Sequence, residues 1–191
     1  AASDVYKRQV QNPSELFLAD RRDEVTGAVV FAGIEGSRPV LVEIEALVAP
    51  STLASPRRNV VGWDSSRLAM LTAVLEARCG VPLSGRDIFL NVAGGFKVSE
   101  TAADLAVAAA LLSSVSGRPA PPRSVFFGEV ALSAELRQVA QADARLKEAA
   151  KLGFDMAVMP RPRKKLGAPQ GLSLAQPATL AELIEIMGGV A

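Results

Sequence analysis

The chain has 191 residues, of which 49% are hydrophobic and 21% are charged, a composition typical of a globular domain with a sizeable core. Its formal net charge of +1 excludes the strongly basic balance of many nucleic-acid-binding domains. Any contact with nucleic acid must therefore come from a local cluster of positive side chains. The sequence has no histidine, which excludes Ser-His-Asp and Cys-His nucleophile systems and most zinc hydrolase sites.

The cysteine content and the hydropathy pattern indicate which cellular compartment fits the chain. Cys79 is the single cysteine, so the chain forms neither an internal disulfide nor a zinc site of several cysteines. A reducing, cytoplasmic location fits this usage. The sequence contains no run of about 18 apolar residues and no N-terminal signal pattern, so no membrane association is expected.

The N-terminal third is predicted to begin with a tail and continue as strands. Residues 1–9 are polar and aperiodic, and we interpret them as a non-native or disordered tail ahead of one domain at 10–191. Periodicity then predicts further elements, namely one helical turn at 14–18, strands at 28–32 and 40–48, a hairpin turn at Gly36-Ser37 and a loop at 49–62.

The rest of the chain alternates predicted helices and strands. Asp64 or Ser65 is expected to cap a helix that continues to about Arg78 and ends at Gly80. An alanine-rich buried helix is predicted at 102–115. Other elements follow from periodicity, as strands at 87–92, 124–132, 136–139, 156–159 and 172–174 and helices at 142–152 and 179–187. Together they predict a single α+β domain without internal repeats.

A glycine pair precedes a lysine and superficially suggests a phosphate-binding loop. A P-loop needs a glycine, four residues and then Gly-Lys-Ser/Thr leading into a helix. Here Phe96 separates Gly95 from Lys97, and a polar stretch comes before the next helix. We therefore interpret Gly94-Gly95 as a turn that glycine permits.

Two segments resemble Lon proteases. GGFKVSETAADLAVA, from Gly94, is similar to the strand, loop and helix that hold the nucleophilic serine, and GEVALSAELR, from Gly128, begins the segment that holds the lysine. Aligned without gaps, the serine position falls on Ala102 and the lysine position on Asp143. Neither side chain can perform the dyad chemistry, because alanine is no nucleophile and aspartate no neutral amine. A divergent peptidase that uses another Ser-Lys pair remains the alternative hypothesis.

Further segments resemble the bacterial RadA (Sms) family of DNA-repair proteins. They are NPSELFL at 12–18, EGSRPVLVE at 35–43, Ala49-Pro50, DSSRLAML at 64–71 and residues 145–154. The resemblance extends from Val10 to about Gly188. It implies a Lon protease-like (ribosomal protein S5 domain 2-like) fold of the α+β class, with a mixed sheet and packed helices.

The same resemblance implies a ring-forming, ATP-driven protein that binds DNA and promotes branch migration during recombinational repair. The zinc motif and RecA-like ATPase core of that family would precede residue 10, so ATP, Mg²⁺ and Zn²⁺ are expected there. No cofactor or metal site is expected on this segment. The leading hypothesis is a scaffold fragment without enzymatic activity that assembles as a homo-hexamer and binds single-stranded or branched DNA. RecA recombinase is a further expected partner, and a pure assembly module is the third possibility.

Four positive side chains are candidates for DNA contacts. Arg57 and Arg58 stand together in the predicted loop, where two forked cations can grip phosphates. Arg67 can reach DNA or a neighbouring subunit, with an i, i+3 ion pair to Asp64 as the alternative. Lys97 lies on the loop where Lon would bind substrate.

Two other features favour ordinary structural roles. Residues 161–165 form the densest positive run, which is interpreted as a solvated surface segment. Trp63 lies between a glycine and the helix cap, and we expect it to pack against the core edge in preference to stacking on a base.

Overall fold

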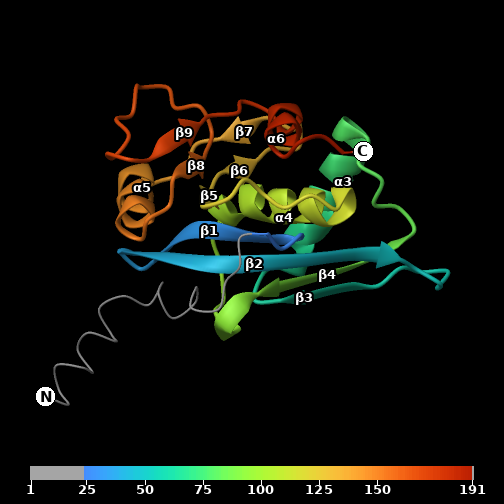
Figure 1. Cartoon of the computed structure of the whole chain (residues 1–191). Helices are drawn as coiled ribbons and strands as arrows, with labels where there is room; N and C mark the ends of the chain where they lie inside the picture. The colour runs from blue at the N-terminus through green and yellow to red at the C-terminus, as the bar shows by residue number, and fades with distance from the viewer. Residues whose placement is uncertain (1–23, 191) are drawn as a thin grey trace, which may run out of the picture.

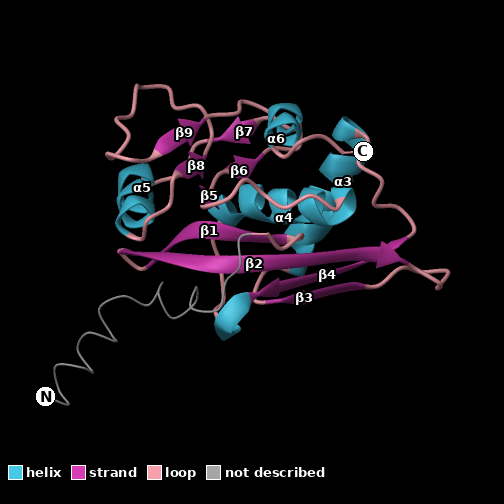
Figure 2. Cartoon of the chain, in the orientation of Figure 1, coloured by secondary structure: helices cyan, strands magenta, loops and turns pink. Residues whose placement is uncertain are grey.

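The computed structural model describes residues 24–190 as a mixed sheet with packed helices (Figures 1 and 2). The strands of the main sheet are β1 (Ala28–Glu35), β2 (Arg38–Pro50), β3 (Arg58–Val61), β4 (Arg86–Val92), β5 (Ser124–Phe126), β8 (Met156–Val158) and β9 (Ser173–Ala175). A small second sheet pairs β6 (Glu129–Val130) with β7 (Leu136–Arg137). The α+β class and the mixed sheet are confirmed, whereas the Lon-like assignment stays a prediction. The predicted tail at 1–9 and helical turn at 14–18 lie outside the described residues.

The four α-helices of the described region are α3 (Ser65–Cys79), α4 (Asp104–Ser116), α5 (Ala142–Lys151) and α6 (Leu180–Ile186). The predicted cap of α3 is confirmed, because Asp64 accepts a hydrogen bond from the Ser66 N–H at 2.7 Å. Gly80 ends this helix in the left-handed conformation with φ of 67°. Trp63 is buried beside the cap and packs in the core, as predicted.

The centre of the fold is the hairpin β1–β2. Its strands pair antiparallel from Ala28↔Glu45 to Glu35↔Arg38, and the two residues between them make the predicted turn. Gly36 supplies the positive φ of 63° that this turn needs. The hairpin therefore sets the register from which the sheet extends in both directions.

The main sheet has the order β3-β4-β2-β1-β5-β8-β9. β4 is antiparallel to β2, whereas β3 and β4 are parallel, as are β1, β5, β8 and β9 in turn. The parallel step from β5 to β8 is made through α5, as parallel strands require a crossover. In Figure 1, β3 and β9 lie at opposite edges of the molecule.

Two predicted boundaries were wrong. Residues 49–62 were expected to be a loop, but Arg58–Val61 form the edge strand β3. This strand is four residues long and mostly exposed, so it has no apolar alternation to reveal it. The predicted strand at 124–132 is two strands, because the chain breaks at Gly128 and pairs first with β8 and then with β7.

Burial patterns show which faces of the sheet are covered. All of Ala28–Gly33 in β1 is buried, which requires cover on both faces, and both α4 and α5 contact β1 and β2. From Ile88 to Val92 in β4 and in the second half of β2, buried residues alternate with more exposed ones, so one face of that region is open. Leu47 and Val61, with exposed fractions of 57% and 58%, lie on this open side.

The helix α4 fills the core. It contacts β1, β2, α3 and α6, and its residues from Leu105 to Leu111 are 0% exposed. Figures 1 and 2 show it between the β1–β2 hairpin and the helices α3 and α6. Four of those buried residues are alanines, and the small side chains let sheet and helices approach closely on several sides.

We expect the substitution Ala108→Leu to lower the free energy of unfolding by about 1–3 kcal/mol, because a larger side chain forces off-rotamer packing in a filled core. The matched control is Ala73→Leu on the exposed side of α3, with an expected change within about 0.5 kcal/mol. Urea unfolding of both variants measures the difference. Equal effects of the two substitutions would contradict the tight packing of α4.

Candidate nucleic-acid interface

Arg57 lies immediately before β3 and is held by Asp87 at the start of β4. Its backbone N–H donates to one carboxylate oxygen at 2.6 Å, and its Nε and Nη2 donate to the other at 3.1 and 2.8 Å. These hydrogen bonds lower the pKa of Asp87 from its ordinary 3.8 to about 2, with a further contribution from Ser51, against an opposing effect of burial. The guanidinium also lies over the Phe89 ring, 5.6 Å from its centroid.

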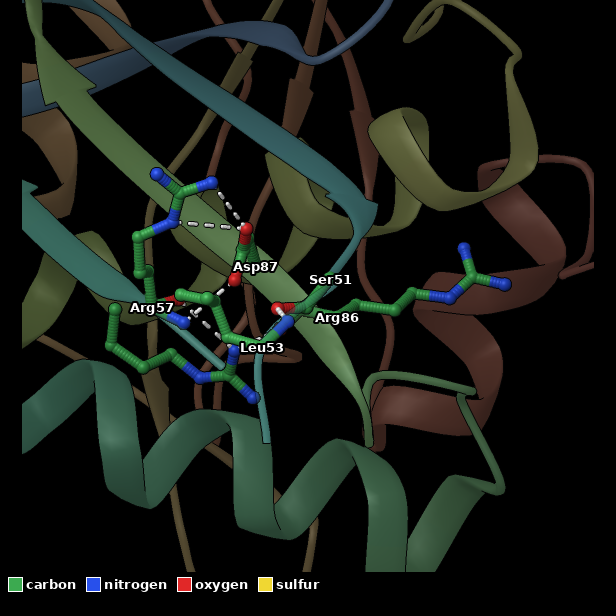
Figure 3. A network of polar contacts seen from close by, with 6 residues as sticks. Ser51, Leu53, Arg57, Arg86 and Asp87 are labelled. Atoms are coloured by element: carbon green, nitrogen blue, oxygen red, sulfur yellow. Dashed lines mark hydrogen bonds and ion pairs between the residues drawn. The ribbon is translucent and has the colours of Figure 1, made fainter. Parts of the chain in front are cut away.

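Arg58 begins β3, and no carboxylate of residues 24–190 forms an ion pair with it. Its Nη1 donates to the backbone carbonyls of Arg57, at 3.3 Å, and of Arg86, and neither acceptor is charged. Figure 3 shows Asp87 facing the guanidinium of Arg57, with the Arg86 side chain extending away from this pair. The side chain of Arg57 is 56% exposed despite its ion pair. The structure therefore brings the two predicted arginines to one exposed end of an edge strand.

Lys97 lies near the other end of the same strand. Its neighbour Val98 donates a backbone hydrogen bond to the carbonyl of Gly62 at 2.8 Å, and Gly62 follows β3 directly. A Cβ at Gly62 would lie 2.7 Å from the Phe96 carbonyl oxygen, so only glycine permits this approach. Lys97 is exposed. Sequence reasoning could not place it beside β3, because the contact depends on this close approach.

Arg67 is bound within the fold. Its Nε donates to Asp104 Oδ1 at 2.9 Å and its Nη2 donates to Oδ2, linking α3 to the start of α4. The side chain of Asp104 is 1% exposed, and its Oδ2 also accepts from the Val130 N–H at 3.0 Å. Burial raises the pKa of Asp104, and the hydrogen bonds from Arg67 and Val130 oppose that rise. The expected alternative partner, Asp64, serves instead as the cap of α3.

The two positions aligned with the Lon dyad differ in exposure. Ala102 is 2% exposed and its carbonyl accepts from the Gly128 N–H at 2.8 Å, whereas Asp143 is exposed in the first turn of α5. In the described region no hydrogen bond joins Lys97 to Ser99. The glycine pair forms a single 3₁₀ turn, with φ of 74° and 70°, and extended residues follow it, as the interpretation as a turn predicts.

An ion pair between a buried arginine and a partly buried glutamate, which sequence reasoning missed, lies beside these positions. Arg145 Nη2 donates to Glu100 Oε1 at 2.6 Å, and Nη1 donates to the Ala32 carbonyl at 2.8 Å. Glu100 Oε2 in turn accepts from the Ile34 N–H at 2.7 Å. The pair therefore ties α5 and the segment before α4 to β1. The sequence singles out Arg145 only as part of the segment 145–154 that resembles the family. Its spacing does not reveal an ion-pair partner 45 residues away.

Neither a metal centre nor a membrane helix is found in the described region. Between residues 24 and 190, no group of three or more His, Cys, Asp or Glu side chains is placed to hold a metal ion. Over the same residues, no helix is long and apolar enough to cross a membrane.

The stabilising effect of Asp87 is expected to depend on pH. Because its pKa in the folded protein lies below its ordinary 3.8, its contribution is fully present above that value and is lost as the pH falls toward about 2. Melting temperatures between pH 6 and pH 2 should show Asp87→Asn less stable than the unmodified chain at the high end and nearly equal at the low end. Asp143→Asn on exposed α5 is the control, and an unchanged gap at low pH contradicts the Arg57–Asp87 pair.

The main role expected of Arg67 is to stabilise the fold through its ion pair with Asp104. Arg67→Met leaves the Asp104 carboxylate buried without its cation, so the free energy of unfolding should fall by about 3 kcal/mol. Arg78→Met, an exposed arginine at the other end of α3, should change it by less than about 0.5 kcal/mol. Chemical unfolding measures both. Similar losses of unfolding free energy in the two variants would contradict a structural role of the Arg67–Asp104 pair.

Known proteins resemble this chain over most of its length. Residues 63–163 match the family model described as subunit ChlI of Mg-chelatase. The DNA repair protein RadA of Brucella abortus is 56% identical over 182 residues, which are 95% of this chain and 39% of the relative. RadA of Rickettsia felis is 53% identical over 150 residues, 78% of this chain and 34% of the relative. RadA of Pseudomonas aeruginosa is 48% identical over 180 residues, 94% of this chain and 40% of the relative.

The chain thus spans less than half the length of these relatives. The expectation that this fragment is not an enzyme is contradicted, because the matching family model describes a subunit of an enzyme. The loss of one Ser-Lys dyad concerns only the chemistry of that dyad and leaves other activities open. The matched stretch contains Ala102 and Asp143, the two positions on which that expectation rested. The chain belongs to the RadA family of DNA repair proteins, and its residues 63–163 belong to the family of subunit ChlI of Mg-chelatase.

Proposed function

We propose that this chain helps a RadA-type protein assemble as a ring and bind single-stranded or branched DNA during branch migration. ATP, Mg²⁺ and Zn²⁺, a hexameric state and RecA recombinase as a partner belong to the same proposal for the whole protein. The observation that supports DNA binding is the position of Arg57 and Arg58 at the exposed start of β3, with Lys97 near the end of that strand.

The spacing of these cations suits a nucleic-acid backbone. Four residue steps separate Arg58 from Gly62, beside which Lys97 lies, and this corresponds to roughly 13 Å of extended chain. One DNA strand carries a charge about every 3.4 Å along the helix axis, so the cations span roughly four nucleotides. Arg58 is the strongest candidate of the three, because its hydrogen-bond partners are neutral carbonyls.

The neighbouring sheet face limits where the DNA lies. Phe89 and Asn59 border the cations on the open face of the sheet, and Glu43 and Glu45 lie farther across it on β2. An aromatic ring and an amide are compatible with exposed bases, whereas the two carboxylates repel phosphates. The favoured path of a strand therefore follows the β3 edge and does not cross the face toward β2.

The double substitution Arg57→Ala with Arg58→Ala is expected to weaken DNA binding by about tenfold or more at low salt. It should also make the fall of log affinity with log salt less steep by roughly 2, since about one counterion is released for each phosphate contact. Fluorescence anisotropy with a labelled single strand and a labelled fork, over a series of salt concentrations, measures both quantities.

The control is Arg78→Ala with Arg137→Ala, which removes the same charge from exposed positions outside β3. Asp87→Asn provides a second test in the opposite direction, because it removes the carboxylate that neutralises Arg57 and should tighten binding. If the control pair weakens binding as much as the Arg57 and Arg58 pair, the β3 edge is not the DNA site.

A further inference from the structure

A pocket with a volume of about 350 Å³ opens beside the start of α5. Its interior is apolar and is formed by Phe127, Val139, Ala142, Met159, Pro160 and Leu166. Its remaining lining includes Arg163 and Lys164, both exposed. Within residues 24–190, no carboxylate forms an ion pair with either cation. The pocket therefore fits an apolar side chain that has a carboxylate next to it.

The chain itself presents such a group on the turn between β6 and β7. Leu132 is 64% exposed, more than any other large hydrophobic side chain of the described region. The turn is held by backbone hydrogen bonds from Ala131 to the Glu135 carbonyl and from Ala134 to the Ala131 carbonyl, both at 2.9 Å. Glu135 is also exposed, and among the described residues no Lys or Arg pairs with it. The exposed side chain of Leu132, called the knob below, and the Glu135 carboxylate thus lie on the same ordered turn.

We propose that Leu132 of one copy of this chain inserts into the apolar pocket of a second copy, where Glu135 faces Arg163 and Lys164. The pairing of Val130 with Leu136 and of Glu129 with Arg137 places Leu132 at the turn end of the β6–β7 hairpin and the pocket residues Phe127 and Gln138 at its other end, so knob and pocket are different surfaces of one copy. A contact between two different surfaces is head-to-tail, and it forms a ring when the rotation from one copy to the next closes after a whole number of copies. This inference rests on the assembly part of the proposed function and names the contact.

The test uses two variants of the full chain, one without the knob and one without the pocket. Leu132→Asp keeps the pocket, and Ala142→Trp fills the pocket but keeps the knob. Each variant alone should be monomeric by light scattering and sedimentation at concentrations where the unmodified chain assembles. Their equimolar mixture should form a one-to-one dimer and nothing larger, because one knob and one pocket remain.

A charge exchange tests the polar part of the contact. Glu135→Lys should weaken assembly by about tenfold or more, and combining it with Arg163→Glu and Lys164→Glu should restore it. Leu53→Asp, at another exposed leucine, is the control and should assemble normally. Circular dichroism verifies folding, and Val139→Arg replaces Ala142→Trp if that variant is misfolded.

Three results would overturn the proposal: a monomeric unmodified chain, normal assembly of Leu132→Asp, or a mixture that stays monomeric. If Ala142→Trp prevents assembly but Leu132→Asp does not, the pocket is occupied by another segment of this chain or by another protein, and not by Leu132. DNA binding separates this test from that of the proposed function. Monomeric Leu132→Asp should keep the cations of β3 and bind DNA weakly, whereas Arg57→Ala with Arg58→Ala should assemble normally.

Discussion

The buried guanidinium of Arg145 joins parts of the chain that are far apart in sequence. It donates to carbonyls of Ala32 and Ala140 and to the Glu100 carboxylate, and it lies over the Phe127 ring. Removing a charge from water is expensive, and a buried pair is tolerated only when most of its donors are satisfied. Arg145 meets that condition, so the start of α5, strand β1 and the segment before α4 must keep one arrangement.

A second pair, Arg67 with Asp104, fixes the other side of the same segment. Asp104 begins α4, and Arg67 belongs to α3, so the most buried helix is bound by a carboxylate at its first residue. Glu100 and Asp104 thus stand on either side of Ala102. Ala102 therefore lies between two carboxylates that are each held by an arginine.

Local features of the fold were predictable from the sequence, and long-range ones were not. The hairpin turn at Gly36, the Asp64 cap and the alanine-rich α4 each depend on a few neighbouring residues. The strand β3 was missed because it is short, exposed and stabilised by pairing with β4. Spacing suggested Asp64 as the partner of Arg67, but the actual partner is 37 residues away and is brought near by helix packing. Of the proposed DNA contacts, sequence identified the cations but not the strand that arranges them.

The edge position of β3 has a further consequence for solubility. An unpaired strand edge exposes backbone donors and acceptors that invite a strand from another chain, and natural sheets discourage this with charge and short length. β3 has both protections, since it is four residues long and begins with Arg58 and Asn59. Val61 at the end of β3 and Leu47 on β2 are exposed on the open face of the same sheet, where apolar side chains would otherwise favour stacking of sheets. Arg58, which is proposed to contact phosphates, thus also opposes pairing of β3 with a strand of another copy and the fibres that such pairing would build.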